Sequence, residues 1–494
     1  MRLELAICAG VMMCGPALAQ DVYPGCEVPT TVAGRHTFFV DPVKGSDKGD
    51  GSMARPWKSL NTVLAPASKL LATNTHKTLS GSPLLAVNPG APVKGGDVIM
   101  LMSGDHGDVA LTNVFNSKFI TIMAAPGQTP IIQHLRIGGA NRWMFQGVTF
   151  QSEYPSGSKQ NANTQVNISN GWGDTTKNIV FDHDTFQAAS DSSGWSDADW
   201  FSKPNYFTIG INATCVSVTN STLQNLLNGI AVNSPQALIK NNTFRKFSND
   251  AIDVVASKVA IVSNTITDPM HNGTSGMHPD AIQAWSNPVN GKMSNPNNDI
   301  LIDSNRVYVA KSPDGVRGIL QGITIGFCKN VTIQNNVIST NLWNAIFANG
   351  MWDTRILNNT VASSDPIGHP SRIYVGASIY NPSSNVTIRN NLAALISADD
   401  TSVTMDHNAA TMNFTTSAAG KVVWHPTGIS ASGNVVNSTL TSNFRNWDPA
   451  KNNFDLRLKA GSALNSMGSS TLAPLVDADG ALRTAPVALG AYTK

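Results

Sequence analysis

Short apolar segments separated by polar turns fill most of the chain from residue 96 onward. Segments 119–123 and 179–181, for example, are too short for helices and are rich in β-branched and aromatic side chains. Runs of this kind, bounded by turn residues, are typical of β-strands. The pattern therefore predicts an all-β chain rather than a helical one.

A phrase built around asparagine recurs at a regular interval. Its asparagines are Asn220, Asn242, Asn264, Asn305, Asn336, Asn359 and Asn391. Neighbouring copies lie 22 or 23 residues apart, or further apart where an insertion intervenes. This period, with short strands and no helical pattern, predicts a single-domain parallel β-solenoid in which each repeat is one turn of a coil. Stacked asparagines would form a ladder whose amides satisfy buried backbone groups at the turns.

A second phrase, of the form polar-small-Ile-polar-apolar, sets the register of the coils. It begins at Asn228, Asp250, Asp280, Gln321 and Asn344. Because side chains alternate along a strand, the isoleucine of each copy should face the core and the next residue should face outward. The expected core residues are Ile230, Ile252, Ile282, Ile323 and Ile346, and the outward residues include Asp253, Gln283 and Thr324.

Three insertions interrupt the repeat, at residues 266–279, 286–299 and 308–318. They border the two neighbouring phrases that begin with an aspartate, Asp250 and Asp280. Insertions in solenoids form loops on one face, and that face is often the binding face. We therefore expect the functional site on the outer face of these coils.

Three acidic residues gather at this expected site. Asp250, Asp253 and Asp280 would lie on adjacent coils, which stack about 4.8 Å apart. Carboxylates this close cannot all ionise cheaply, so at least one pKa should rise. A protonated carboxyl beside an ionised one is the arrangement that acid–base cleavage of a glycosidic bond requires. The cluster therefore favours a glycoside hydrolase that acts on a polysaccharide.

His278 and Arg317 allow a second chemistry at the same place. A histidine can abstract the proton next to a uronate carboxylate, and an arginine can neutralise that carboxylate. These residues would suit a polysaccharide lyase or a uronate epimerase, with His271 as a weaker alternative base. The three aspartates would then be able to hold Ca²⁺, which prefers oxygen ligands, whereas the hydrolase needs no cofactor. A β-helix that only binds glycan is the third alternative.

Polar and aromatic side chains beside the aspartates are the expected substrate contacts. They are Gln283, Trp285, Gln321 and Trp343. Tryptophan faces stack on sugar rings because the indole is flat and amphipathic. Further loop aromatics are Trp172, Trp195, Trp200, Tyr206 and Trp352, and Asp191, Asp197 and Asp199 accompany two of them in a loop that we expect to overhang the cleft.

The first residues carry an export signal. Arg2 precedes an apolar run over residues 5–13, and residues 17–19 fit a signal-peptidase site. We expect a signal peptide over 1–19, an N-terminal cap and loop over 20–95, coils over 96–420, and C-terminal coils with a cap over 421–494. Within the first cap, residues 61–92 should form a helix and a loop. The mature protein would be secreted or periplasmic.

Composition argues against several classes of partner. Only 13% of the residues are charged and the net charge is +2, which gives no argument for nucleic acid or an anionic membrane. No further segment reaches 18 apolar residues, so no membrane span is predicted. We expect a monomer whose partner is its polysaccharide substrate.

Three cysteines remain after removal of the signal peptide, namely Cys26, Cys215 and Cys328. An odd number leaves at least one thiol unpaired within the chain. None has the spacing of a zinc or redox site. We therefore interpret them as buried small apolar residues.

Both ends of the chain and the aspartate coils resemble known families. Residues 36–60 resemble the opening of secreted right-handed parallel β-helix proteins, and residues 453–492 resemble the C-terminal cap of secreted β-helix polysaccharide enzymes. Residues 249–253 are similar to the Asn-Thr-Asp-Gly-x-Asp motif of polygalacturonase-type hydrolases, in the pectin-lyase-like superfamily. Residues 280–282 are similar to the second half of their Asp-Asp-Cys coil, and residues 322–326 to the strand after their Gly-His-Gly. This resemblance, over about three coils, implies that Asp280 is the general acid and that Asp250 and Asp253 hold the attacking water.

Overall fold

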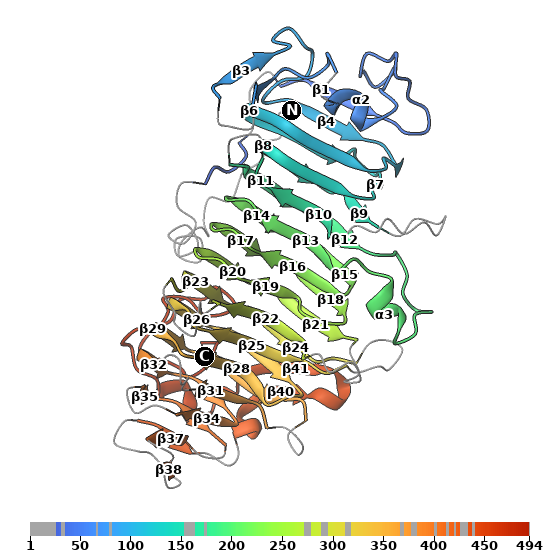
Figure 1. Cartoon of the computed structure of the whole chain (residues 1–494). Coiled ribbons are helices and arrows are strands. Elements are labelled where there is room, and N and C mark those ends of the chain that lie inside the picture. The colour runs from blue at the N-terminus through green and yellow to red at the C-terminus, as the bar shows by residue number, and fades with distance from the viewer. Residues whose placement is uncertain are drawn as a thin grey trace, which may run out of the picture.

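The chain winds into a long three-sided coil whose strands stack into parallel sheets (Figure 1). The computed structural model describes residues 26–30, 35–65, 68–78, 82–152, 164–171, 175–270, 278–287, 295–311, 318–365, 370–376, 383–399, 403–411, 414–418, 421–424, 433–436 and 440–493. Strands of one coil pair with the equivalent strands of the coils before and after it. The predicted all-β parallel solenoid is therefore confirmed.

Each coil contributes one strand to each of three sheets. Sheet 1 contains β10 (Thr164–Ser169), β13 (Phe207–Asn212), β16 (Asn228–Val232), β19 (Ile252–Val254), β22 (Asp280–Trp285), β25 (Gln321–Gly326), β28 (Asn344–Asn349), β31 (Arg372–Gly376), β34 (Leu395–Ala398) and β37 (Phe414–Ala418). Sheet 2 contains β1 (Thr37–Val40), β4 (Val98–Leu101), β11 (Lys177–Asp182), β14 (Val216–Thr219), β17 (Ala237–Lys240), β20 (Val259–Val262), β23 (Asn298–Asp303), β26 (Lys329–Gln334), β29 (Trp352–Leu357), β32 (Ser384–Arg389) and β35 (Thr404–Asp406). The long strands β6 (Val109–Ala124) and β8 (Leu135–Gln146) run through both of these sheets.

Sheet 3 is the third side of the coil. It contains β5 (Gly104–Asp105), β7 (Pro130–Ile132), β9 (Thr149–Gln151), β12 (Thr185–Gln187), β15 (Thr222–Leu226), β18 (Thr243–Phe247), β21 (Thr265–Pro269), β24 (Arg306–Tyr308), β27 (Val337–Thr340), β30 (Thr360–Ser363), β33 (Leu392–Ala393), β36 (Ala409–Ala410) and β39 (Val435–Val436). A turn or loop leads from each sheet 3 strand into the next strand of sheet 1. The insertions around the aspartates fall partly in such turns, so they border sheet 1.

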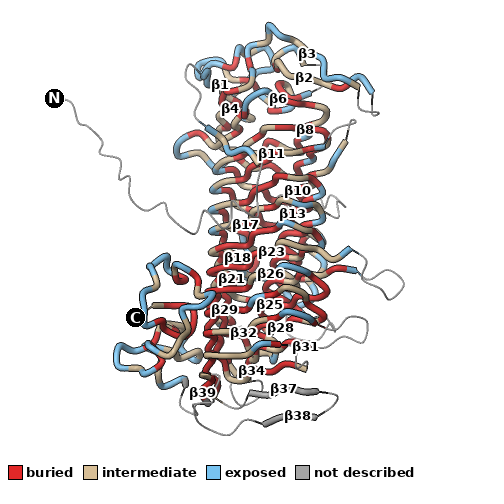
Figure 2. The backbone as a smooth tube through the Cα atoms, turned by 90° about the vertical axis from the view of Figure 1, so that its left-hand side faces the viewer, coloured by how far each residue is buried: buried red, intermediate tan, exposed pale blue. Residues whose placement is uncertain are grey.

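The core is a stack of aliphatic side chains along the axis of the coil. In Figure 2 most of the backbone that winds around this axis is coloured as buried. The predicted isoleucine column is confirmed, because its members pair in register from strand to strand and are at most 1% exposed: Ile230, Ile252, Ile282, Ile323 and Ile346. The same register places Asp253, Gln283 and Thr324 side by side on the opposite, outward face of sheet 1. Burial of one face thus fixes which side chains meet on the other.

The predicted asparagine ladder exists and extends beyond the predicted range. From Asn242 to Asn391, each asparagine donates its Nδ2 to the Oδ1 of the next one at 2.9–3.0 Å. The ladder continues to Asn408 and Asn434. Each Oδ1 also accepts the backbone N–H of the preceding asparagine, as Asn305 does for Asn264. The ladder therefore satisfies turn groups that the core would otherwise leave without partners.

The assignment of Asn220 to this ladder is wrong. Ser221 holds the ladder position, because its backbone N–H donates to Asn242 Oδ1 at 2.9 Å. Asn220 has a φ of 51° and belongs to the adjoining column of left-handed turn residues, together with Asn241 and Asn335 (φ 57° and 56°). Asparagine is common at both positions because it tolerates left-handed backbone and also bonds backbone groups. The sequence pattern alone does not separate the two columns.

Replacing one ladder residue should destabilise the fold. Asn305 is fully buried, and Asn305→Ala would remove its bonds to Asn336 Oδ1 and Ile261 O and leave Asn264 without its acceptor. Each buried group left without a partner costs about 1–3 kcal/mol, so we expect a loss of about 3 kcal/mol or more. Thermal unfolding followed by circular dichroism measures it. Asn233→Ala, at an exposed Asn–Asn pair, is the control and should change little; equal stability of the two variants would contradict this role.

The N-terminal part differs from the predicted helix and loop over 61–92. The helix α2 (Leu60–Leu64) has only five residues, and an antiparallel hairpin follows it, formed by β2 (Thr73–His76) and β3 (Leu84–Val87). The hairpin lies against β6 through the pairing of Asn74 with Phe115. Threonine-rich and β-branched segments favour strands over helices, which the mixed composition of this region obscures.

The C-terminal segment lies along sheet 3. It contains η1 (Leu440–Asn443), β40 (Phe444–Asp448), η2 (Pro449–Lys451), β41 (Asn453–Leu458) and η3 (Ala463–Ser466). The strand before it, β38 (Lys421–Trp424), pairs antiparallel with β37 of sheet 1. The apolar side chains Phe444, Leu456 and Leu464 of the C-terminal segment share one cluster with Val337 and Leu392 of sheet 3. Figure 2 shows this segment beside the later coils. Where we expected a cap on the last coil, residues 440–493 instead cover the side of several coils.

A disulfide joins Cys26 to Cys215. The interpretation of both residues as buried small apolar side chains is therefore wrong. Among the described cysteines, Cys328 is the free and buried one, which agrees with the expected unpaired thiol. The two paired residues are 189 positions apart, a separation from which no pairing can be predicted. The bond ties the start of the described chain to the turn before β14. Within the described residues no helix is long and apolar enough to cross a membrane.

Candidate active site

The predicted aspartates meet at one corner of the coil, where sheet 3 turns into sheet 1. Asp280 is the first residue of β22, and Asp250 lies two residues before β19 on the neighbouring coil. The backbone N–H of Asp280 donates to Asp250 Oδ1 at 2.9 Å. Asp253 lies further along β19 and pairs with Gln283 of β22. The two aspartate phrases are therefore the same strand on successive coils, as predicted.

Asp280 is the centre of the cluster. Its side chain is fully buried. Its Oδ1 accepts the Thr324 hydroxyl at 2.6 Å, and its Oδ2 accepts Gln283 Nε2 at 3.1 Å. The same Oδ2 lies 3.2 Å from His278 Nδ1. Three neighbouring groups, on two strands and one loop, thus fix this carboxylate in place.

Asp250 and Asp253 are partly buried and carry shifted pKa values. Burial, with the charge of Asp280 nearby, raises the pKa of Asp250 to about 7. Burial likewise raises the pKa of Asp253, again with a contribution from Asp280. The prediction that at least one carboxyl pKa rises is therefore confirmed. Asn228 also holds Asp250 in place, because its Oδ1 accepts the Asp250 backbone N–H at 3.2 Å.

His278 stands at the rim of the cluster. Its side chain is 69% exposed, so the imidazole faces solvent on one side and Asp280 on the other. The bond to Asp280 raises the pKa of His278 to about 9. At neutral pH this side chain is therefore an imidazolium that offsets part of the negative charge of the three aspartates.

The four expected substrate contacts have different positions. Gln283 bonds Asp280 and belongs to the cluster. Gln321 pairs with Asp280 across the strands and accepts Asn344 Nδ2 at 2.6 Å. Trp285 packs edge-on against Phe327 with ring centroids 5.0 Å apart.

Trp285 also lies flat over Gly326. A Cβ at Gly326 would approach the Trp285 ring to 2.3 Å, so the indole occupies the space that a larger residue would fill. Trp285 therefore anchors the end of β22. Trp343 is 44% exposed and lies before β28, two coils from the aspartates. Of the two tryptophans, Trp343 is the better placed to touch a ligand.

Several predicted residues lie outside the described residues. They are Arg317, His271, Trp172 and the expected signal peptide over 1–19. Among the residues that are described, no group of three or more His, Cys, Asp or Glu side chains is placed to hold a metal ion. Both oxygens of Asp280 already face hydrogen-bond donors, so a calcium ion would depend on Asp250 and Asp253. Calcium binding stays a prediction.

The predicted overhanging loop borders the cluster. It contains α3 (Asp199–Ser202), and the carbonyl of Trp200 accepts the Ser248 hydroxyl at 2.9 Å, two residues before Asp250. Trp200 is buried, and Trp195 packs edge-on against it with ring centroids 4.7 Å apart. The loop ends at Tyr206, whose carbonyl accepts Asn228 Nδ2 at 2.7 Å. Residues 195–206 therefore form a wall on the N-terminal side of the aspartates.

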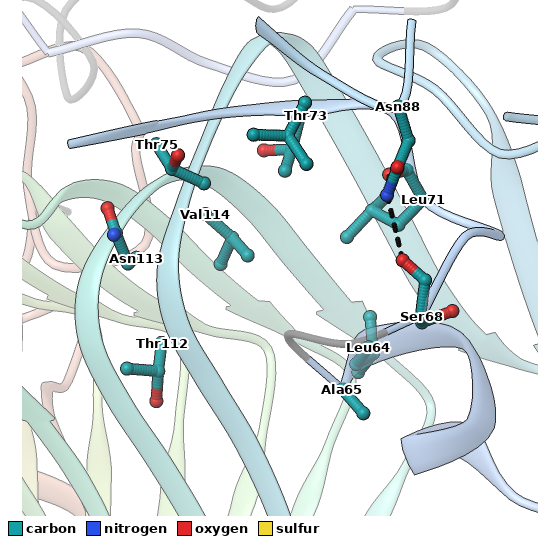
Figure 3. Close-up of a pocket in the computed structure, with 11 residues that line it drawn as sticks. Leu64, Ala65, Ser68, Leu71, Thr73, Thr75, Asn88, Thr112, Asn113 and Val114 are labelled. Atoms are coloured by element: carbon teal, nitrogen blue, oxygen red, sulfur yellow. Dashed lines mark hydrogen bonds between the residues drawn. The ribbon is translucent and has the colours of Figure 1, made fainter. Parts of the chain in front are cut away.

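A cavity of about 200 Å³ lies elsewhere, among the first coils (Figure 3). Leu64, Leu71, Val87 and Val114 supply much of its lining, and Asn88 Nδ2 donates to the Ser68 carbonyl at its edge. The cavity is mostly apolar and several coils away from Asp250. It has no part in the chemistry of the aspartates.

Sequence reasoning missed two features of the site. Thr324 was placed on the outer face but not in the cluster, although its hydroxyl bonds Asp280. The second is Arg372, which lies in the same row of side chains as Gln321 and Asn344. Thr324 already belongs to the predicted outward column, and extending the column of Gln321 and Asn344 by one coil leads to Arg372.

The coiled part of the chain is similar to one family model and to several solved structures. The family model of the right handed beta helix region matches residues 207–393. No curated protein matches the chain significantly. Solved structures of similar shape include pectate lyase Pel9A, at 14% identity and a TM-score of 0.41, which covers 94% of this chain and 97% of its own.

Two other solved structures carry different activities in their names. The GH136 lacto-N-biosidase from Eubacterium ramulus is 11% identical with a TM-score of 0.39, over 75% of this chain and 65% of its own. The A-module of the Azotobacter vinelandii mannuronan C-5 epimerase AlgE4 is 12% identical with a TM-score of 0.37, over 65% of this chain and 88% of its own. At these identities the likenesses say nothing about activity. The family match over residues 207–393 and the stacked coils show that this chain has a right-handed parallel β-helix fold.

Proposed function

We propose that the protein is secreted or periplasmic and hydrolyses glycosidic bonds of a polysaccharide. The observation that carries the proposal is the pair of partly buried carboxyl groups, Asp250 and Asp253, whose pKa values are both raised at the edge of sheet 1. A carboxyl group with a pKa of about 7 is half protonated at neutral pH and can donate its proton to a leaving oxygen. Such carboxyl pairs perform acid–base cleavage of glycosides.

The structure suggests a division of roles. Asp250 is the general acid, and Asp253 is the carboxylate that takes a proton from the attacking water. Asp280 is a positioning residue, because its buried side chain cannot reach a sugar. This differs from the roles implied by the polygalacturonase resemblance, in which Asp280 donates the proton. His278, as an imidazolium, stabilises the ionised carboxylates around it.

The products test the reaction class. The mature protein would be incubated with a panel of acidic and neutral polysaccharides, and reducing ends and ultraviolet absorbance would be recorded together. Hydrolysis releases reducing ends without unsaturated sugars. New absorbance from an unsaturated uronate would refute hydrolysis and indicate elimination.

Activity is expected to fall as the pH rises through about 7. Asp250 must carry a proton to act, and its pKa in the folded protein is about 7, so the active fraction should drop roughly tenfold per pH unit above that point. At low pH, activity should fall because Asp253 becomes protonated and can no longer accept a proton; its pKa also lies above 3.8. A plot of kcat/KM against pH, measured from about pH 4 to about pH 10, would be bell-shaped. Activity that climbs steadily to pH 9 would contradict Asp250 as the acid.

β-Elimination is the second candidate, favoured by one observation. His278 is held by a buried aspartate and is exposed on its other side, which is a suitable arrangement for a base. Because the pKa of His278 is about 9, the imidazole becomes a free base only in alkaline solution. A lyase would therefore gain activity towards pH 9. The direction of the pH dependence separates the two candidates.

A further inference from the structure

An aromatic surface continues sheet 1 beyond the aspartates. The outward column of Asp253, Gln283 and Thr324 leads in register to Phe347 of β28 and Tyr374 of β31. The rings of Phe347 and Tyr374 stack with centroids 5.4 Å apart and an interplanar angle of 17°. Polar side chains at the cluster thus give way to flat rings on the same outer face.

Arg372 is held against these rings. Its guanidinium carbon lies 4.3 Å from the centroid of the Tyr374 ring and 6.0 Å from that of Trp343. Its Nε donates to Asn344 Oδ1 at 3.1 Å, and Asn344 in turn bonds Gln321. Gln321 pairs with Asp280. A row of bonded polar side chains therefore runs from the aspartate cluster to this arginine.

Among the described residues Arg372 makes no salt bridge within 4 Å, although the charge of Asp399 acts on it through space. The neighbouring carboxylate, Asp399, accepts the hydroxyl of Tyr374 instead. Burial lowers the pKa of Arg372, as expected for a partly desolvated cation. Within the described residues its two terminal nitrogens have no hydrogen-bond partner, and a guanidinium held in this way binds a carboxylate through two parallel hydrogen bonds.

We infer that Trp343, Arg372 and Tyr374 form a subsite for a uronate unit of the substrate. The sugar face stacks on the exposed Trp343 ring, and the uronate carboxylate pairs with Arg372. β31 is three strands from β22, about 14 Å at the usual strand spacing, so the subsite lies a few sugar units from the bond that is cleaved. The inference rests on the proposed function for the identity of this polymer as substrate.

The position of the subsite has an electrostatic reason. A uronate placed directly over three aspartates would meet like charge, which costs binding energy. An arginine further along the sheet attracts the polymer without bringing its charge onto the acid–base pair. The anionic group therefore contributes to affinity and to the position of the chain rather than to the chemical step.

Binding to a full-length Asp250→Asn variant tests the subsite without turnover. Oligogalacturonate, oligomannuronate and a neutral xylo-oligosaccharide of equal length would be titrated by calorimetry. Arg372→Gln should weaken binding of the preferred uronate by roughly tenfold or more and leave the neutral oligomer unchanged. Trp343→Ala should weaken both. Arg355→Gln, at an exposed position on β29, is the matched control and should bind as the parent does.

Three outcomes would overturn the inference: neither uronate binds the parent, Arg372→Gln binds uronate as tightly as the parent, or Arg372→Gln weakens uronate and neutral oligomers equally. The last outcome would indicate a subsite for neutral sugar. Uronate binding that depends on Arg372, in a protein that releases no reducing ends, would support the subsite and refute the hydrolase. The two proposals can therefore fail separately.

Discussion

Asp250→Asn should nearly abolish turnover and at the same time stabilise the protein above neutral pH. Removal of a positioned acid lowers kcat by about 10²- to 10⁴-fold. The pKa of Asp250 rises from 3.8 to about 7 on folding, so the folded state binds this proton more tightly than the unfolded state. Stability therefore falls as the pH rises from about 4 through about 7, and the full penalty remains above 7.

The size of this loss of stability follows from the shift in the pKa of Asp250. The difference between 3.8 and about 7 corresponds to at most about 4 kcal/mol. Asparagine carries no charge, so the free energy of unfolding at about pH 8 should rise by about 1–4 kcal/mol, with little change at about pH 4. Denaturant titration at the two pH values measures the gain. A residue kept at a cost in stability is expected where function requires it.

Asp303→Asn is the matched control for Asp250→Asn. Asp303 is also buried, and burial also raises its pKa, but it lies on sheet 2 and bonds Gln334, Ser304 and Asn335. Its replacement should leave kcat per folded molecule unchanged. Full activity of Asp250→Asn, or an equal loss in Asp303→Asn, would refute the acid role of Asp250.

Asp280→Asn should lower kcat by about 100-fold or more through the residues that Asp280 holds. Asparagine keeps the shape of the side chain but loses the charge that raises the pKa of His278. The His278 pKa should therefore fall from about 9 towards the ordinary value of about 6.5. Titration of the imidazole by nuclear magnetic resonance follows this shift, which a purely structural loss of folding would not produce.

Asp182→Asn provides the comparison for Asp280→Asn. Asp182 also contacts a histidine, with its Oδ2 2.7 Å from His183 Nδ1, but that pair lies on β11, remote from the site along the coil. The Asp182 variant should keep full activity. An Asp280→Asn protein with normal kcat, or with an unchanged His278 titration, would show that Asp280 does not position the site.

Much of the fold could be predicted because each coil repeats the same short pattern of apolar and polar residues. A period of about 22 residues and the alternation within each strand were enough to predict the inward isoleucine column and the outward Asp253 and Gln283. Errors arose where two columns use the same residue type, as with Asn220 and Ser221. They also arose where contacts are distant in sequence, as in the Cys26–Cys215 disulfide and the C-terminal segment along sheet 3.

The sequence by itself determined that Asp250 and Asp280 begin equivalent phrases on adjacent coils and that Asp253 faces outward, because a fixed repeat and a strand period of two leave no other register. It could not determine how far each carboxyl group is buried, since burial depends on loops and neighbouring coils. The tertiary structure decided that Asp280 is enclosed by Thr324, Gln283 and His278, while Asp250 stays at the edge with a pKa of about 7. The physical reason is that desolvation and charge proximity act through space, and these two effects distinguish a positioning carboxylate from an acid.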